Sequence, residues 1–138
     1  MADLKDKIGA LCAQAQCDNE GEFLLVTVPD EQWHALAQAL KEQLHFDVLM
    51  ALVGVDWKDS LGCVYYLTNT ETREIIHIKV ATTDRDNPRL HSVADVWDVA
   101  NYQEREVYDF YGIVFINHPD MRRFFLRNDW VGHPLRKD

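Results

Sequence analysis

The sequence predicts a two-layer α+β domain with a mostly antiparallel sheet, helices on one side of that sheet, and an extended C-terminal arm. Three observations support this fold class: apolar residues recur at helical spacing, short apolar runs are bounded by turn residues, and the end of the chain has no periodic pattern. A chain of 138 residues can bury one core without disulfides. We therefore expect one folded domain over residues 1–116 and a docking segment over residues 117–138.

The N-terminal part of the chain predicts a helix and then a strand. Apolar residues at helical spacing predict a helix over residues 4–15, and the polar residues 18–21 break the pattern. The β-prone run 23–28 predicts a strand, which Pro29 closes.

A second helix and a second strand follow. Asp30 is a favourable N-cap for this helix. Its expected core face comprises Trp33, Leu36, Ala37, Leu40 and Leu44. The stretch 48–57 is apolar enough to predict a central strand.

Two further strands are predicted over residues 63–68 and 76–80. In the second of these strands, apolar residues alternate with His77 and Lys79, which indicates one buried face and one solvent-exposed face. A polar loop is expected over residues 82–91.

The next segment predicts two short helices and a last strand. Ser92 and Asp95 form an S-x-x-D capping pattern that would open the first helix. The second helix is expected over residues 103–111 and ends at Gly112, a residue suited to the position after a helix. Residues 113–116 could add a strand, and the proline-containing sequence beyond them predicts the extended arm.

The charge of the chain is unevenly distributed. The net charge is −9, which opposes binding to nucleic acid phosphates. The last part of the chain nevertheless holds a basic cluster: Arg122, Arg123, Arg127, Arg136 and Lys137. This end of the chain is either a segment that meets an acidic protein partner or an ordinary solvated tail.

Cofactor-binding motifs are not apparent in the sequence. Cys12, Cys17 and Cys63 are too few for an all-cysteine iron–sulfur cluster and lack the spacing of a zinc ribbon. No P-loop or dinucleotide-binding glycine motif is present, the longest apolar run is too short to span a bilayer, and no export signal follows Met1. We therefore expect no metal, cofactor, catalytic site or membrane anchor in this chain.

The densest group of charged residues lies in the predicted helix 103–111. Arg105 and Asp109 are four residues apart and could form an ion pair on one helix face. An exposed pair of this kind contributes only a few tenths of a kcal/mol, roughly, whereas breaking a covered pair costs several. The helix is thus either an ordinary solvated helix or part of an interface.

Two long motifs give the chain a specific resemblance. The first comprises Glu104, Arg105, Glu106, Asp109, Phe110, Tyr111, Gly112, His118, Pro119, Arg122 and Arg123. The second comprises Asp129, Trp130, Gly132, His133, Pro134, Leu135, Arg136, Lys137 and Asp138. Together they resemble the signature of the thirty-kilodalton subunit of proton-translocating NADH:quinone oxidoreductase, which is respiratory complex I.

The resemblance implies a structural role without chemistry of its own. In this family the thirty-kilodalton subunit lies against the large quinone-module subunit, in the hydrophilic arm on the cytoplasmic side of the membrane; the two are known by the letters C and D, respectively. FMN, iron–sulfur clusters and quinone are then expected in partner subunits, and contact with the membrane is only indirect. We expect the motif residues after His118 to meet the partner, with Trp130 as a buried anchor and Arg122, Arg123 and Arg136 facing carboxylates.

Three alternatives remain open. A similar subunit occurs beside the large subunit of membrane-bound [NiFe] hydrogenases and formate hydrogenlyase. A small metal-dependent hydrolase could use His118, Asp120, Asp129 and His133, although these residues lack the spacing of a helical zinc motif. The chain could also be a free-standing acidic binding module, although its apolar tail residues would then be left uncovered.

Overall fold

The computed structural model describes residues 2–12, 15–20, 23–84 and 86–118. Its main feature is a five-stranded mixed sheet with the strand order β1-β2-β5-β4-β3. The five strands are β1 (Gln16–Glu20), β2 (Phe23–Thr27), β3 (Val48–Asp56), β4 (Leu61–Thr68) and β5 (Ile75–Thr82). Three of its pairings are antiparallel and the β2–β5 pairing is parallel, so the predicted α+β class with a mostly antiparallel sheet is confirmed.

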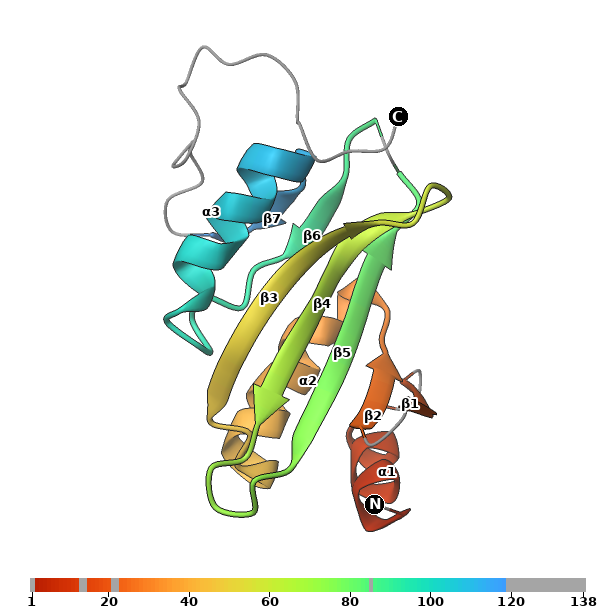
Figure 1. Ribbon diagram of the computed structural model, residues 1–138, viewed down its shortest axis with the longest axis vertical. Helices are drawn as coiled ribbons and strands as arrows, with labels where there is room; N and C mark the ends of the chain where they lie inside the picture. Colours follow the sequence, from red (N-terminus) through yellow and green to blue (C-terminus); the bar gives the residue numbers. More distant parts are fainter. Residues whose placement is uncertain (1, 13–14, 21–22, 85, 119–138) are drawn as a thin grey trace.

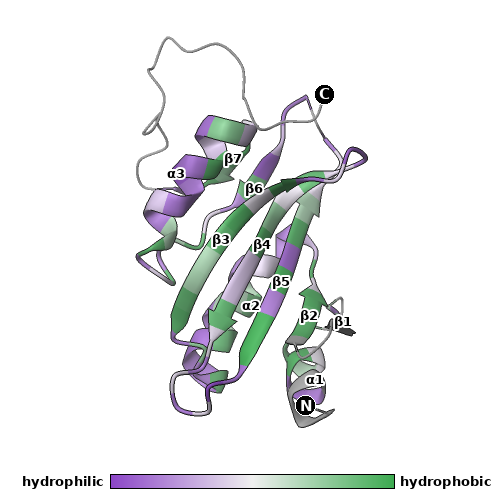
Figure 2. Ribbon diagram, in the orientation of Figure 1, coloured by the Kyte–Doolittle hydropathy of each residue, from purple (hydrophilic) through white to green (hydrophobic). Residues whose placement is uncertain are grey.

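The main core lies between this sheet and α2 (Asp30–Leu44), which crosses behind the sheet in Figure 1. The predicted core face of α2 is confirmed for Trp33, Leu36, Ala37 and Leu40, which are buried; Leu44 is partly buried. Along β5, buried Ile76, Ile78 and Val80 alternate with half-exposed residues, as the sequence predicted. Figure 2 shows the resulting alternation of hydrophobic and hydrophilic residues along β4 and β5.

The strand β3 lies at the edge of the sheet, so the prediction that it is central was wrong. It is apolar because α3 (Ala100–Tyr111) packs alongside it in Figure 1, rather than because strands flank it on both sides. Helix and strand come so close that a Cβ on Gly54 would lie 2.6 Å from the Tyr111 ring. A residue without a side chain is therefore needed at that point.

The N-terminal segment also differs from the prediction. Helix α1 (Ala2–Leu11) is present but ends before residue 15, and residues 16–20 form β1, where a break over residues 18–21 had been expected. Strand β1 pairs along its whole length with β2. Backbone pairing at a sheet edge does not require apolar side chains, so the polar sequence gave no signal of a strand.

A second, two-stranded parallel sheet brings distant segments together. It consists of β6 (Arg89–His91) and β7 (Val114–Ile116). Strand β7 was predicted, whereas β6 falls in the expected loop 82–91. Residues 92–99 form turns in place of the predicted helix, because the Ser92 side chain is bonded to a distant residue.

Candidate functional site

Helix α3 carries the first motif, and most of its charged residues are buried. Glu104 and Asp109 are fully buried and Arg105 is 5% exposed, whereas Glu106 is exposed. The helix is therefore not an ordinary solvated helix, the first of the two alternatives, because three of its charged side chains are buried. Gly112 ends the helix as predicted, with a φ of 79° in the left-handed region.

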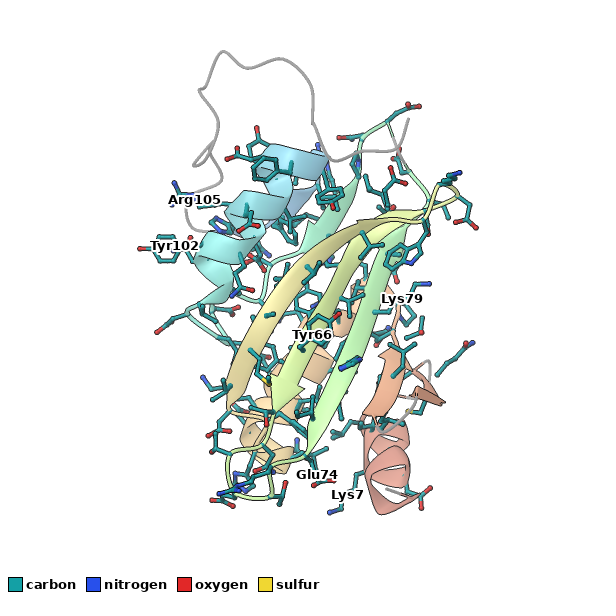
Figure 3. All side chains as sticks on the ribbon, viewed as in Figure 1. Lys7, Tyr66, Glu74, Lys79, Tyr102 and Arg105 are labelled. Carbon is teal, nitrogen blue, oxygen red and sulfur yellow. The ribbon has the colours of Figure 1, made fainter. Side chains whose placement is uncertain are left out.

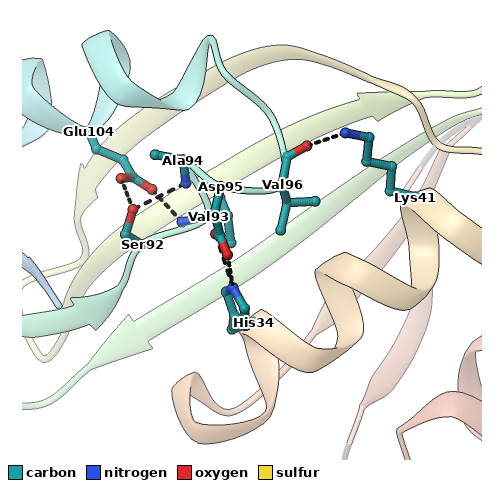
Figure 4. Close-up of polar contacts among 8 residues, drawn as sticks. All are labelled: His34, Lys41, Ser92, Val93, Ala94, Asp95, Val96 and Glu104. Atoms are coloured by element: carbon teal, nitrogen blue, oxygen red, sulfur yellow. Dashed lines mark hydrogen bonds and ion pairs between the residues drawn. The ribbon is translucent and has the colours of Figure 1, made fainter. Parts of the chain in front are cut away.

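The carboxylate of Glu104 joins α3 to the turn that follows β6. Ser92 Oγ donates a hydrogen bond to it at 2.6 Å, and the backbone N–H of Val93 donates another at 2.9 Å (Figure 4). The Ser92 hydroxyl also accepts a bond from the N–H of Ala94 at 3.1 Å. The polar partner of Ser92 is thus Glu104, from another element, rather than Asp95 as the capping pattern suggested.

Burial makes Glu104 a poor place for a negative charge. Burial, with a smaller contribution from the charge of Asp95, raises the pKa of the carboxyl from its usual 4.5 to about 7. The hydrogen bonds from Ser92 and Val93 oppose this shift. Glu104 therefore titrates near neutral pH while its two hydrogen bonds hold the turn in place.

This shift predicts a pH-dependent stability. The native state keeps the Glu104 proton to a higher pH than the unfolded chain, so the stabilisation is full below pH 4.5 and is lost as the pH rises through about 7. We expect the free energy of unfolding to fall between pH 5 and pH 8 by about 2 kcal/mol more in the wild type than in Glu104→Gln. Urea titrations at the two pH values measure this difference. An equal change in the free energy of unfolding between pH 5 and pH 8 for both proteins would contradict the prediction.

His118, the last described residue of the first motif, is held beside Glu104. Its side chain is fully buried, and its Nε2 lies 3.0 Å from the carbonyl oxygen of Asn101 and 3.9 Å from Glu104 Oε1. Two residues earlier in the chain, the carbonyl of Ile116 accepts a bond from the N–H of Ser92 at 2.9 Å. The segment through His118 is therefore fixed both to the turn after β6 and to α3.

Helix α2 is joined to the same region by a row of polar contacts. The contacts are Asp30 with the N–H and Nδ1 of His91 (both 2.7 Å), His34 Nε2 with Asp95 (2.9 Å), and Lys41 Nζ with the carbonyl of Val96 (2.6 Å). The last two are drawn in Figure 4. Asp30 does not cap its own helix, because its carboxylate binds His91; the prediction of an Asp30 cap was wrong.

Part of the predicted site lies outside the described residues, namely Pro119, Arg122, Arg123, Asp129, Trp130, Gly132, His133, Pro134 and Arg136. Sequence reasoning missed the binding roles of Val93, Asn101 and His91. Their contacts join residues separated by 11, 17 and 61 positions. No short-range pattern carries such a signal, and only the S-x-x-D pattern drew attention to Ser92.

Metal or cluster ligands do not gather within the described ranges. No group of three His, Cys, Asp or Glu side chains there could hold a metal ion. Cys12 and Cys63 are buried free thiols, and burial raises the pKa of Cys63 well above its usual value. Of the residues considered for a hydrolase, the structure describes only His118. The helices of the described part also include none that is long and apolar enough to cross a bilayer.

The fold and the buried cluster define a small α+β module in which charged residues brace one helix against a neighbouring turn. A comparison with family models matches residues 26–138 to the respiratory-chain NADH dehydrogenase 30 Kd subunit family. The chain belongs to this family, which confirms the resemblance found in the sequence.

Relatives of known name agree with this family. The chain is 53% identical over 114 residues to the NADH-quinone oxidoreductase subunit named C/D of Phocaeicola vulgatus, covering 82% of this chain but 22% of that protein. It is 42% identical over 140 residues to the subunit named C of Chloroherpeton thalassium, covering 98% of this chain and 57% of the relative. The protein of the same name from Geobacter sulfurreducens is 37% identical over 139 residues, covering 98% of this chain and 84% of the relative. The chain thus spans about a fifth of the C/D protein.

A solved structure supports the fold over nearly the whole chain. A chain of a membrane-bound sulfane sulfur reductase, an archaeal respiratory membrane complex, matches with a TM-score of 0.80 at 26% identity. The match covers 93% of this chain and 77% of the other.

Proposed function

We propose that this chain is a non-catalytic structural subunit of the hydrophilic arm of a proton-translocating NADH:quinone oxidoreductase. Residues 1–116 act as a scaffold, and residues 117–138 dock against the large quinone-module subunit. The protein is peripheral, on the cytoplasmic side of the cell inner membrane, and contacts the membrane only through the complex. FMN, iron–sulfur clusters and quinone belong to its partners.

The observation that carries this proposal is that some relatives are named as two subunits, C and D, in one polypeptide. The protein of Phocaeicola vulgatus bears both letters in its name, and this chain accounts for 22% of its length. Its remaining length is ample for a second, larger unit in the same polypeptide. Two units that are covalently joined stay at high effective concentration, which favours a direct contact between them.

The arrangement around Glu104 supports a fixed origin for the docking segment. Glu104 and the carbonyl of Asn101, both on α3, lie against the side chain of His118, the residue from which the remaining motif residues continue along the chain. The two parts of the first motif therefore act together: the helix braces the domain, and the residues after the helix contact the partner. Trp130 supplies a large apolar anchor, and the arginines supply planar groups that bind carboxylates in pairs.

An equivalent subunit of a [NiFe] hydrogenase or formate hydrogenlyase, beside the hydrogenase large subunit, is the second candidate. The observation in favour of this candidate is that the matching solved structure belongs to a membrane-bound sulfane sulfur reductase. This fold is therefore used in more than one kind of respiratory complex. The relatives at 37–53% identity carry the name NADH-quinone oxidoreductase, and this favours the first candidate.

The docking proposal is tested by capture with an affinity-tagged large quinone-module subunit. We compare the full chain with a chain that ends after His118, which keeps the buried contact to Asn101. Loss of the segment is expected to lower the captured amount at least tenfold, roughly the effect of losing one interface hot spot. A chain with Lys7→Ala and Lys58→Ala, two exposed cations of the folded domain, serves as the control and is expected to be captured normally.

Thermal unfolding of the shortened chain shows whether its domain is still intact. Undiminished capture of the shortened chain would contradict the role of residues 117–138. If the large quinone-module subunit fails to capture even the full chain, the choice of partner is contradicted. Capture by a hydrogenase large subunit instead would favour the second candidate.

A further inference from the structure

Exposed large apolar side chains lie on two neighbouring elements of the described structure. Three are on the edge strand β3, one directly precedes α3, and one is in the first turn of α3: Val48, Met50, Val53, Val99 and Tyr102. Figure 3 shows Tyr102 pointing from α3 away from the sheet. Residues of β3 and of the turn before α3 line a hollow of about 440 Å³, at Val48 and Val99. Residues of β3 and α3 line a smaller hollow of about 140 Å³, at Val53 and Phe110. We call the surface that these two hollows share the β3–α3 crease; Tyr102 lies outside it.

A β-bulge turns one of these side chains outward. The pairing of β3 with β4 shifts register between Leu49 and Ala51, so Met50 has no opposite residue in the ladder. Its side chain is 52% exposed. A bulge on an edge strand hinders the addition of another strand, whereas a flexible methionine adapts well to an apolar surface. The crease is therefore shaped for side-chain packing.

The charged groups around the crease are mainly acidic. Asp47 and Asp98 border the larger hollow and Glu106 borders the smaller one, and all three are exposed. The nearby ammonium of Lys41 is bonded to the carbonyl of Val96 at 2.6 Å. An apolar centre with a rim of carboxylates is complementary to an apolar surface that carries basic groups.

We propose that the β3–α3 crease binds a segment of a neighbouring protein in the assembly, with an apolar centre flanked by Lys or Arg. A second copy of this chain fits less well, because a symmetric contact would bring the same acidic rims together. An anionic lipid surface would also be repelled by these carboxylates. The inference rests on the proposed function only in that it requires an assembly of several proteins, and the crease is separate from residues 117–138 in sequence.

The test places a photo-crosslinking residue, p-benzoylphenylalanine, at position 50 or position 99 of the chain in cells that make the whole complex. The complex is purified through a tag on this chain and irradiated, and the crosslinked peptides are identified by mass spectrometry. We expect both positions to join one partner protein, at a peptide with apolar residues flanked by Lys or Arg. The same residue at position 35, an exposed site on α2, is the control and should give no such product.

Charge reversal on the rim tests the stated chemistry of the partner. Asp98→Lys combined with Glu106→Lys should lower the crosslink yield at position 50 at least threefold, or release the chain from the complex. Glu42→Lys combined with Glu71→Lys makes the same change of charge at exposed sites elsewhere and should leave the yield unchanged. Circular dichroism of the isolated variants checks that both are folded.

Three results would overturn the inference: no crosslink from position 50 or 99 in the intact complex, a crosslink only to a second copy or to lipid, or a partner peptide without basic residues. These results differ from a failure of the proposed function. If the large quinone-module subunit binds the full chain but the crease forms no crosslink, only the crease proposal fails. If the chain joins no complex, the proposed function fails and the crease proposal fails with it.

Discussion

Trp33→Ala is expected to lower the free energy of unfolding by about 4 kcal/mol, the typical cost of removing a fully buried tryptophan. Trp33 is wholly buried under the sheet, with its ring centroid 4.8 Å from that of Tyr65 and 6.2 Å from that of Trp97. The cavity left by the mutation cannot close easily, because Trp97 is also held by a hydrogen bond to the carbonyl of Phe46. Thermal unfolding should show a midpoint lower by roughly 10 °C.

Tyr102→Ala is the matched control for this change. Tyr102 is also aromatic, but it is 56% exposed, so its removal should alter stability by less than about 0.5 kcal/mol. A loss for Trp33→Ala no larger than the loss for Tyr102→Ala would show that the three-ring cluster is not a main source of stability.

Glu104→Ala is expected to destabilise the domain by about 3 kcal/mol at pH 7, because it leaves the Ser92 hydroxyl and the Val93 N–H buried without their acceptor. The truncation also removes the connection between α3 and the turn after β6. Urea unfolding measures the loss, and limited proteolysis should show cleavage within residues 92–99 before the sheet is cut.

Glu106→Ala, two positions further along the same helix, is the control. Its side chain is exposed, so we expect a change within about 0.5 kcal/mol. Because alanine favours helices, any difference between the two variants reflects the buried contacts of Glu104 rather than helix propensity. Equal effects of the two substitutions would contradict the bracing role of Glu104.

The sequence predicted the elements whose signal is local. The strands β2, β4, β5 and β7 and the helix α2 were recognised from alternation, helical spacing and turn residues. The family motif on α3 was also recognised before any geometry was known. These signals lie within a few residues of one another, so the chain displays them without its fold.

Elements that depend on distant partners were predicted less well. Strand β6 is short and polar, and it exists because it pairs with β7, more than twenty residues later. Strand β1 depends in the same way on pairing with β2. The turn at 92–99 was read as a helix because its Ser92 resembles a cap, whereas its actual partner is Glu104.

By itself, the sequence determined the fold class, the family and the position of the charged motif on a helix. Only the tertiary structure decided that Glu104, Arg105 and Asp109 are buried while Glu106 is exposed, and that an apolar strand forms the edge of the sheet. The physical reason is that periodicity records which residues of one element share a face. The burial of a charge and the order of strands depend instead on which other elements pack there.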